Sequence, residues 1–82
     1  IRDTEKREVD FVVIKDSKPL FAVECKSGER NISSAIEYFA TRTPIPVFYQ
    51  VHLGQTHKVS TIAKKTVEII PFLNWVKKLE LP

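Results

Sequence analysis

The chain has 82 residues, 43% of them hydrophobic and 28% charged, and a formal net charge of +3 at pH 7. That length allows at most one small domain, and the mixture of apolar and charged residues is ordinary for a soluble globular domain. No apolar run approaches the length of a membrane span, no signal-peptide pattern is present, and a single cysteine suits a reducing compartment. We therefore expect a cytoplasmic domain with no membrane contact. Because the first residue is Ile1 rather than methionine, we expect it to be a piece of a longer protein.

The first predicted element is an antiparallel hairpin. Residues 9–14 and 20–25 are apolar runs of strand length that are rich in valine and phenylalanine. Residues 15–18 between them are polar and favour a turn, and Pro19 has no N–H to give to a strand ladder.

The register of this hairpin depends on the length of its loop. If residues 16–18 form the loop, counting inward places Ile14 opposite Leu20 and Val12 opposite Ala22. Directly opposed residues share a face of the sheet, with Cβ atoms about 5 Å apart. A shift of one residue would give every later residue a different partner and would move its side chains to the other face.

Three charged residues lie in this otherwise apolar hairpin. The same register places Asp10 opposite Glu24, and strand alternation places Lys26 on the face of Glu24, with Cys25 on the other face. Two carboxylates held that close repel each other unless a cation lies between them. One interpretation is an ion pair between Lys26 and one of the acids. The other is a site for a hard divalent cation, because Mg²⁺ is typically held by one or two carboxylates with water completing its shell.

A helix is predicted next. Its apolar residues recur at the spacing of one helix face and are Ile32, Ala35, Ile36, Phe39 and Ala40. Asn31 can serve as the N-cap, and Ser34 with Glu37 forms an alternative capping box. Pro44 and Pro46 end the helix.

The rest of the chain predicts further strands and a last helix. Residues 47–53 form a strand that should run parallel to the second strand of the hairpin, because a helix separates the two in a right-handed βαβ unit. Gln50 lies inside this strand, where we expect a hydrogen bond within the sheet. Residues 58–63 predict a short edge strand and residues 67–70 a further strand. Pro71 suits the first turn of a C-terminal helix.

The charged residues of the hairpin resemble those of a known nuclease superfamily. Asp10, thirteen intervening residues and then Glu24-Cys25-Lys26 resemble the PD-(D/E)xK superfamily, which includes many restriction enzymes and Holliday-junction resolvases. The stretches REVDFV (residues 7–12) and AVECKSG (residues 22–28) look still more like a domain of unknown function. That domain is found at the C-terminus of many bacterial and archaeal AAA+-type ATPases.

The resemblance implies a site and its cofactor. Asp10 and Glu24 would be ligands of Mg²⁺ or Mn²⁺, with the backbone carbonyl of Cys25 as a third ligand, and Lys26 would be the catalytic lysine. The substrate would be a nucleic acid, which a mildly basic chain permits without requiring. The ATPase domain would belong to the same chain, so that residues 1–82 would be a single domain in a C-terminal fragment.

We therefore expect an α/β fold. It should contain a mixed β-sheet with an antiparallel hairpin and a βαβ unit, as in a restriction-endonuclease-like core truncated at its N-terminus, plus a C-terminal helix. Its function would be that of a metal-dependent nuclease-like domain with Asp10, Glu24 and Lys26 as catalytic residues. The alternative is a non-catalytic accessory or nucleic-acid-binding module of the ATPase. Because the acid-bearing first helix of the superfamily is absent from this chain, we expect the chain alone to be inactive.

Overall fold

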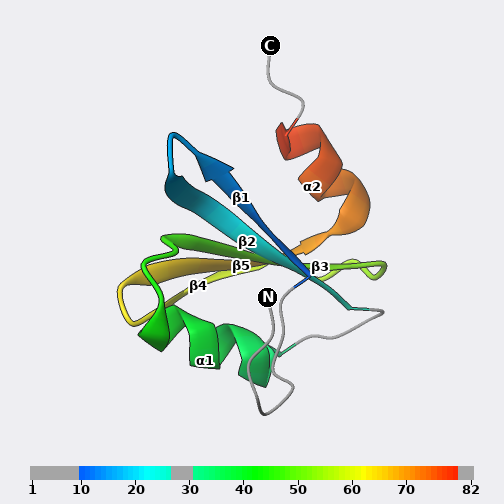
Figure 1. Ribbon diagram of the computed structural model, residues 1–82. Helices are drawn as coiled ribbons and strands as arrows, with labels where there is room; N and C mark the ends of the chain where they lie inside the picture. Colours follow the sequence, from blue (N-terminus) through cyan, green and yellow to red (C-terminus); the bar gives the residue numbers. More distant parts are fainter. Residues whose placement is uncertain (1–9, 27–30, 80–82) are drawn as a thin grey trace.

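The computed structural model describes residues 10–26 and 31–79, which form a mixed α/β fold with one five-stranded sheet and two helices (Figure 1). In chain order the elements are β1 (Phe11–Lys15), β2 (Lys18–Lys26), α1 (Ser34–Arg42), β3 (Val47–His52), β4 (Lys58–Ile62), β5 (Lys65–Pro71) and α2 (Phe72–Leu79). No helix in this part of the chain is long and apolar enough to cross a membrane.

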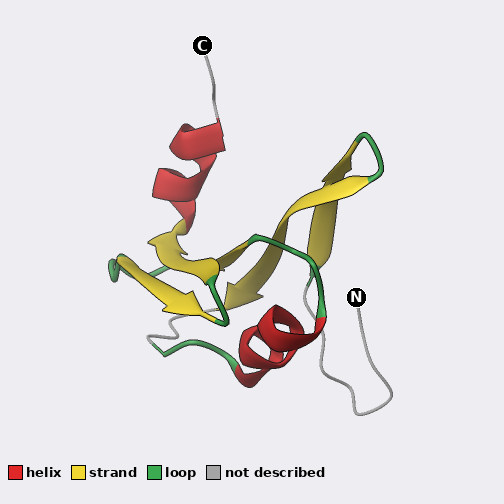
Figure 2. Cartoon of the chain, turned by 90° about the vertical axis from the view of Figure 1, so that its left-hand side faces the viewer, coloured by secondary structure: helices red, strands yellow, loops and turns green. Residues whose placement is uncertain are grey.

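The sheet has the order β1-β2-β3-β5-β4, with three parallel strands in the centre and an antiparallel hairpin at each edge. The predicted parallel pairing of β2 and β3 through α1 is confirmed. The two helices lie on opposite faces of the sheet (Figure 2). The strand predicted at residues 67–70 is longer, at 65–71, and inserts beside β3 as an interior strand, so the edge strand β4 pairs with β5.

The first hairpin has a shorter loop than its sequence suggested. Asp16 and Ser17 alone form the turn, with φ of 53° and 65°. A two-residue turn with both central φ angles positive matches the right-handed twist of the strands, which explains why it is preferred to a three-residue loop. The prediction that Ile14 lies opposite Leu20 is therefore wrong, because Ile14 pairs with Pro19.

A bulge restores the predicted register further along the hairpin. The irregularity lies between Val13 and Ile14, where Leu20 is the extra residue of β2. One additional residue on one strand shifts all later pairs by one position. Val12 therefore lies opposite Ala22, as predicted, and the one-residue error in the loop does not reach the charged end of the hairpin.

Helix α1 covers one face of the sheet and builds the larger core there. The buried residues of this core are Ala22, Ile36, Phe39, Ala40, Ile45, Phe48 and Val67. The predicted apolar stripe is confirmed for Ala35, Ile36, Phe39 and Ala40, whereas Ile32 lies before the helix begins. Neither predicted N-cap is right. Ser33 is the N-cap, because its backbone is extended and its hydroxyl accepts a hydrogen bond from the backbone N–H of Ile36.

Helix α2 packs on the opposite face around an aromatic cluster. The indole of Trp75 lies with its ring centre 6.2 Å from that of Phe11, 6.3 Å from that of Tyr49 and 6.5 Å from that of Phe72. Beneath these rings are the buried side chains of Val23, Val51 and Ile70. Pro71 ends β5 rather than occupying the first turn of the helix, which begins one residue later.

Candidate functional site

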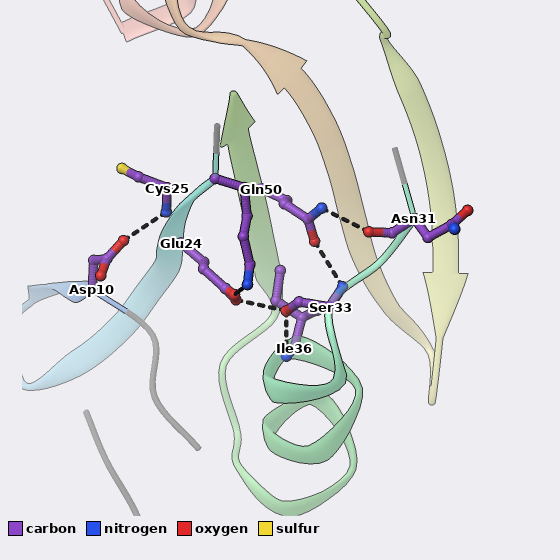
Figure 3. Close-up of polar contacts among 8 residues, drawn as sticks. Asp10, Glu24, Cys25, Asn31, Ser33, Ile36 and Gln50 are labelled. Carbon is purple, nitrogen blue, oxygen red and sulfur yellow. Dashed lines mark hydrogen bonds and ion pairs between the residues drawn. The ribbon is translucent and has the colours of Figure 1, made fainter. Parts of the chain in front are cut away.

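The polar side chains predicted to form a site lie where the parallel strands β2 and β3 end, beside the start of α1 (Figure 3). In open α/β sheets this crevice outside the carboxyl ends of the strands is where ligands usually bind. The buried polar residues on this side of the sheet are Glu24, Gln50 and His52. Polar groups are rarely buried without hydrogen-bond partners, so the partners of each residue indicate its role.

Glu24 lies on β2 with only 5% of its surface exposed. Its Oε1 atom accepts a hydrogen bond of 2.6 Å from the Ser33 hydroxyl. Its Oε2 atom lies 3.7 Å from the Nζ atom of Lys26, whose side chain is 39% exposed. Glu24 and Lys26 therefore share one face of β2, as strand alternation predicted, and the buried carboxylate is compensated by one hydroxyl and one partly exposed ammonium.

Asp10 directly precedes β1 and is tied to β2 by its backbone and its side chain. Its N–H donates to the carbonyl oxygen of Val23 at 2.9 Å, and its Oδ2 atom accepts from the N–H of Cys25 at 2.6 Å. The ladder of β1 and β2 begins at the pair of Phe11 and Val23, so Asp10 lies just outside it, and the predicted pairing of Asp10 with Glu24 is not part of the ladder. The exposed Asp10 carboxylate is thus held against the backbone of the residue between Glu24 and Lys26.

The side chain of Cys25 points away from the site, although its backbone N–H binds Asp10. The residue is exposed, and strand alternation turns its side chain away from the face of Glu24. Partial burial is the main cause that raises the pKa of the thiol, and the nearby carboxylates of Asp10 and Glu24 raise it further. The thiol is therefore protonated at neutral pH, and the group that Cys25 can offer to this site is its backbone.

Gln50 is a member of this polar cluster that the sequence placed in the sheet without a site role. It is fully buried on β3, opposite Glu24 in the parallel register. Its Oε1 atom accepts from the N–H of Ser33 at 2.8 Å, and its Nε2 atom donates to the carbonyl of Asn31 at 2.7 Å (Figure 3). The expected hydrogen bond within the sheet is therefore wrong, because both partners lie in the segment before α1. The signal in the sequence was a lone amide in an apolar strand, and strand alternation could not reveal its partners.

His52 closes the carboxyl end of β3. It is 2% exposed and pairs with Lys26 in the register of β2 and β3. Its Nδ1 atom accepts from the N–H of Gly54, so the proton on Nε2 is donated to the carbonyl of Thr56. Both ring nitrogens are used within the turn after β3, which makes His52 a structural residue of that turn.

An open apolar hollow of about 310 Å³ lies beside the site. It is lined by Cys25, Lys26, Val51, His52, Leu53 and Phe72. Cys25, whose N–H binds Asp10, and Lys26, which lies near Glu24, both line this hollow.

A second charged cluster lies on the other face of the sheet. Glu68, which is 5% exposed, binds Lys78 of α2 at 2.8 Å and His57 at 2.5 Å. Burial has the largest single effect and raises the pKa of Glu68, but the hydrogen bonds and charges of Lys78 and His57 together outweigh it and lower the pKa. The bond to Glu68 in turn raises the pKa of Lys78. This cluster fixes α2 to β5.

Asp10, Glu24 and the backbone of Cys25 form what we call the acidic edge. Their oxygen atoms could supply part of the ligand set of a hard cation. Asp10, Glu24 and the Cys25 backbone offer oxygen, which Mg²⁺ and Mn²⁺ prefer. Oε1 of Glu24 accepts from a hydroxyl, whereas Oε2 makes, among the described residues, only the long contact to Lys26, so Oε2 is the oxygen that a cation could use. Among the residues that the structure describes, no three His, Cys, Asp or Glu side chains lie close enough together to hold a metal ion. A cation here would therefore need several waters.

Fold and site together define a mixed α/β domain with two carboxylates and a lysine at the carboxyl end of its parallel strands. The family model for DUF4143, a domain of unknown function, matches residues 1–75. The chain therefore belongs to the DUF4143 family. No curated protein and no solved structure matches it.

Proposed function

We propose that this domain is a nuclease-type module of the PD-(D/E)xK class, with Asp10, Glu24 and Lys26 as its site residues. The observation that supports it best is the arrangement at the end of β2. There the Glu24 carboxylate and the Lys26 ammonium share a face, and the Asp10 carboxylate is bound to the backbone between them. A carboxylate such as that of Glu24 is rarely buried unless it is paired or functional, because its desolvation is costly.

In this proposal Asp10, Oε2 of Glu24 and the carbonyl of Cys25 hold one Mg²⁺ or Mn²⁺ ion. When bound, such an ion polarises a phosphodiester oxygen and lowers the pKa of a water. Lys26 is the cation that approaches the scissile phosphate, because its side chain is partly exposed while that of Glu24 is buried. Its ammonium would stabilise the charge that develops on the phosphate in the transition state. The protein ligands are few, so we expect weak metal binding.

The wider setting of the domain is also a proposal. The resemblance of residues 7–12 and 22–28 to ATPase-linked domains favours a C-terminal position behind an AAA+-type ATPase domain in the same protein. The mildly basic net charge of +3 is compatible with a nucleic acid as the substrate. The intact set of two acids and one lysine favours phosphodiester hydrolysis over simple binding.

One observation favours a second candidate, a non-catalytic regulatory or nucleic-acid-binding module. Oε1 of Glu24 accepts a hydrogen bond from the Ser33 hydroxyl, and Oε2 faces Lys26. A carboxylate satisfied in this way stabilises the start of α1 without any metal. In that case the acidic edge would be a structural feature, and the ATPase would supply the activity.

Metal binding and cleavage distinguish the two candidates. Mn²⁺ titration, followed by the loss of the free-ion paramagnetic signal, should show one weak site that the double substitution Asp10→Asn plus Glu24→Gln abolishes. Asp16→Asn plus Glu37→Gln is the matched control, because it removes the same charge from two exposed carboxyl residues away from the site. Binding that survives the first pair unchanged would rule out this metal site.

Cleavage is tested with the full-length protein on single-stranded, duplex and branched DNA and on RNA. We expect cleavage that requires Mg²⁺ or Mn²⁺ and that Lys26→Ala abolishes. Metal binding without cleavage of any of these substrates would favour the regulatory module. Cleavage that Lys26→Ala leaves intact would contradict the assignment of the lysine.

A further inference from the structure

The amide of Gln50 is fully buried and makes hydrogen bonds at both of its ends. Its partners are backbone groups of the segment that leads into α1. The acceptor Oε1 receives the N–H of Ser33, and the donor Nε2 reaches the carbonyl of Asn31. A buried group with complementary donors and acceptors on two nearby residues fixes the position of that segment relative to the sheet.

Ser33 carries this restraint from Gln50 to Glu24. Its backbone N–H is bound by Gln50, and its hydroxyl donates to Oε1 of Glu24 at 2.6 Å. The same hydroxyl accepts from the N–H of Ile36 at 3.2 Å, which sets its direction at the start of α1. Glu24 and Gln50 are partners in the register of β2 and β3, so the three residues join two strands and one helix start (Figure 3).

We propose that Gln50 and Ser33 are positioning residues for the Glu24 carboxylate, with Gln50 acting through Ser33 and without touching Glu24 itself. This inference rests on the proposed function, because it concerns how the same acidic edge holds a cation. The Ser33 hydroxyl anchors Oε1 and leaves Oε2 turned toward Lys26. Groups that orient a metal ligand in this way typically change metal affinity by about 10–100-fold when they are removed.

The chemistry of an amide explains why this position needs glutamine. An amide accepts with one end and donates with the other, which is what Ser33 and Asn31 require. Gln50→Glu would place a carboxylate oxygen against the Asn31 carbonyl, so that two acceptors face each other. Gln50→Leu keeps a similar volume but leaves both backbone groups without a partner.

The experiment measures Mn²⁺ affinity of the folded protein for Ser33→Ala, Ser33→Thr and Gln50→Leu. We expect Ser33→Ala and Gln50→Leu each to weaken binding by about tenfold, and Ser33→Thr to retain most of the affinity because it keeps the hydroxyl. The double variant Ser33→Ala/Gln50→Leu should bind no more weakly than Gln50→Leu alone, because both residues act through one hydrogen bond. Unchanged or tighter binding in Ser33→Ala would overturn the inference.

Thr43→Ala is the matched control. Thr43 lies at the other end of α1, where its hydroxyl donates to the carbonyl of Phe39 at 2.8 Å. Removal of this hydroxyl deletes a comparable hydrogen bond from the same helix, so the melting temperature of the Thr43→Ala protein should fall as in Ser33→Ala. Its Mn²⁺ affinity should stay that of the parent protein. An equal loss of affinity in Thr43→Ala would mean that helix stability, and not the position of Glu24, decides metal binding.

A second readout needs no metal. The ¹³C signal of the Glu24 carboxyl carbon, observed in metal-free protein at neutral pH, should shift in Gln50→Leu and stay in place in Thr43→Ala. If this signal does not move in Gln50→Leu, the relay through Ser33 is refuted whether or not metal binds. If it moves as expected but the parent protein binds no Mn²⁺, the relay stands and the proposed metal site fails.

Discussion

The packing of α1 on the sheet gives a quantitative prediction for Phe39→Ala. Phe39 is 7% exposed and belongs to the core cluster that α1 forms with the sheet. The other buried members of this cluster are Ala22, Ile36, Ala40, Ile45, Phe48 and Val67, so loss of the ring would leave a cavity in the larger core. Replacement of a buried phenylalanine by alanine typically costs about 3–5 kcal/mol, and a rigid surrounding places the cost toward the upper end. A domain of this size has a total stability of about 4–12 kcal/mol, so the variant should lose a third or more of it.

Urea unfolding followed by circular dichroism measures this cost. Thermal unfolding gives a second measure of it. For a domain of this length each kcal/mol lowers the melting temperature by about 4–8 °C, so the melting temperature of Phe39→Ala should fall by more than 10 °C. Leu73→Ala is the matched control, since Leu73 is 70% exposed on α2 and should change stability by less than about 0.5 kcal/mol. A loss below about 1 kcal/mol in Phe39→Ala would show that this face of α1 does not pack on the sheet as described.

Two further predictions concern charge and backbone conformation. The pKa of Glu68 is lowered in the fold, so the unfolded chain binds a proton more readily, and the stability from its bonds to Lys78 and His57 is lost as the pH falls below about 4.5. Glu68→Gln should therefore flatten the acid limb of a stability–pH curve, and an unchanged slope would contradict the lowered pKa. Ala63 and Lys64 form the turn between β4 and β5 with φ of 50° and 66°, a conformation that costs residues with a Cβ about 1–2 kcal/mol. Ala63→Asn with Lys64→Gly should raise the free energy of unfolding by about 1 kcal/mol, and a decrease would refute the assignment of this turn.

Local patterns in the sequence determined most of the elements. Alternation and apolar runs predicted the strands, and the spacing of Ile36 and Phe39 predicted the buried face of α1, because each signal depends only on residues a few positions apart. The strand period alone also placed Glu24 and Lys26 on one face. The parallel pairing of β2 and β3 followed from the helix between them.

Details that depend on backbone geometry were harder to predict from the sequence. The loop of the first hairpin is two residues rather than three, since Asp16 and Ser17 both adopt positive φ angles that their residue types do not demand. The bulge at Leu20 compensates for that difference, and no local pattern marked it. The N-cap is Ser33 rather than Asn31 or Ser34, because several polar residues in a row are all acceptable caps by type.

What only the tertiary structure decided is the set of partners around Glu24. The sequence by itself supplied the two acids and the lysine and their order along one hairpin. It could not show that the hydroxyl of a serine nine positions further along binds the Glu24 carboxylate, or that a glutamine on the neighbouring strand binds the backbone of that serine. These contacts arise because the connection from β2 through α1 to β3 brings the start of α1 to the ends of both strands. Such a meeting of distant segments has no signature in the residues themselves. The insertion of β5 beside β3 is of the same kind, since the choice of a neighbour in the sheet is made by packing across the whole core.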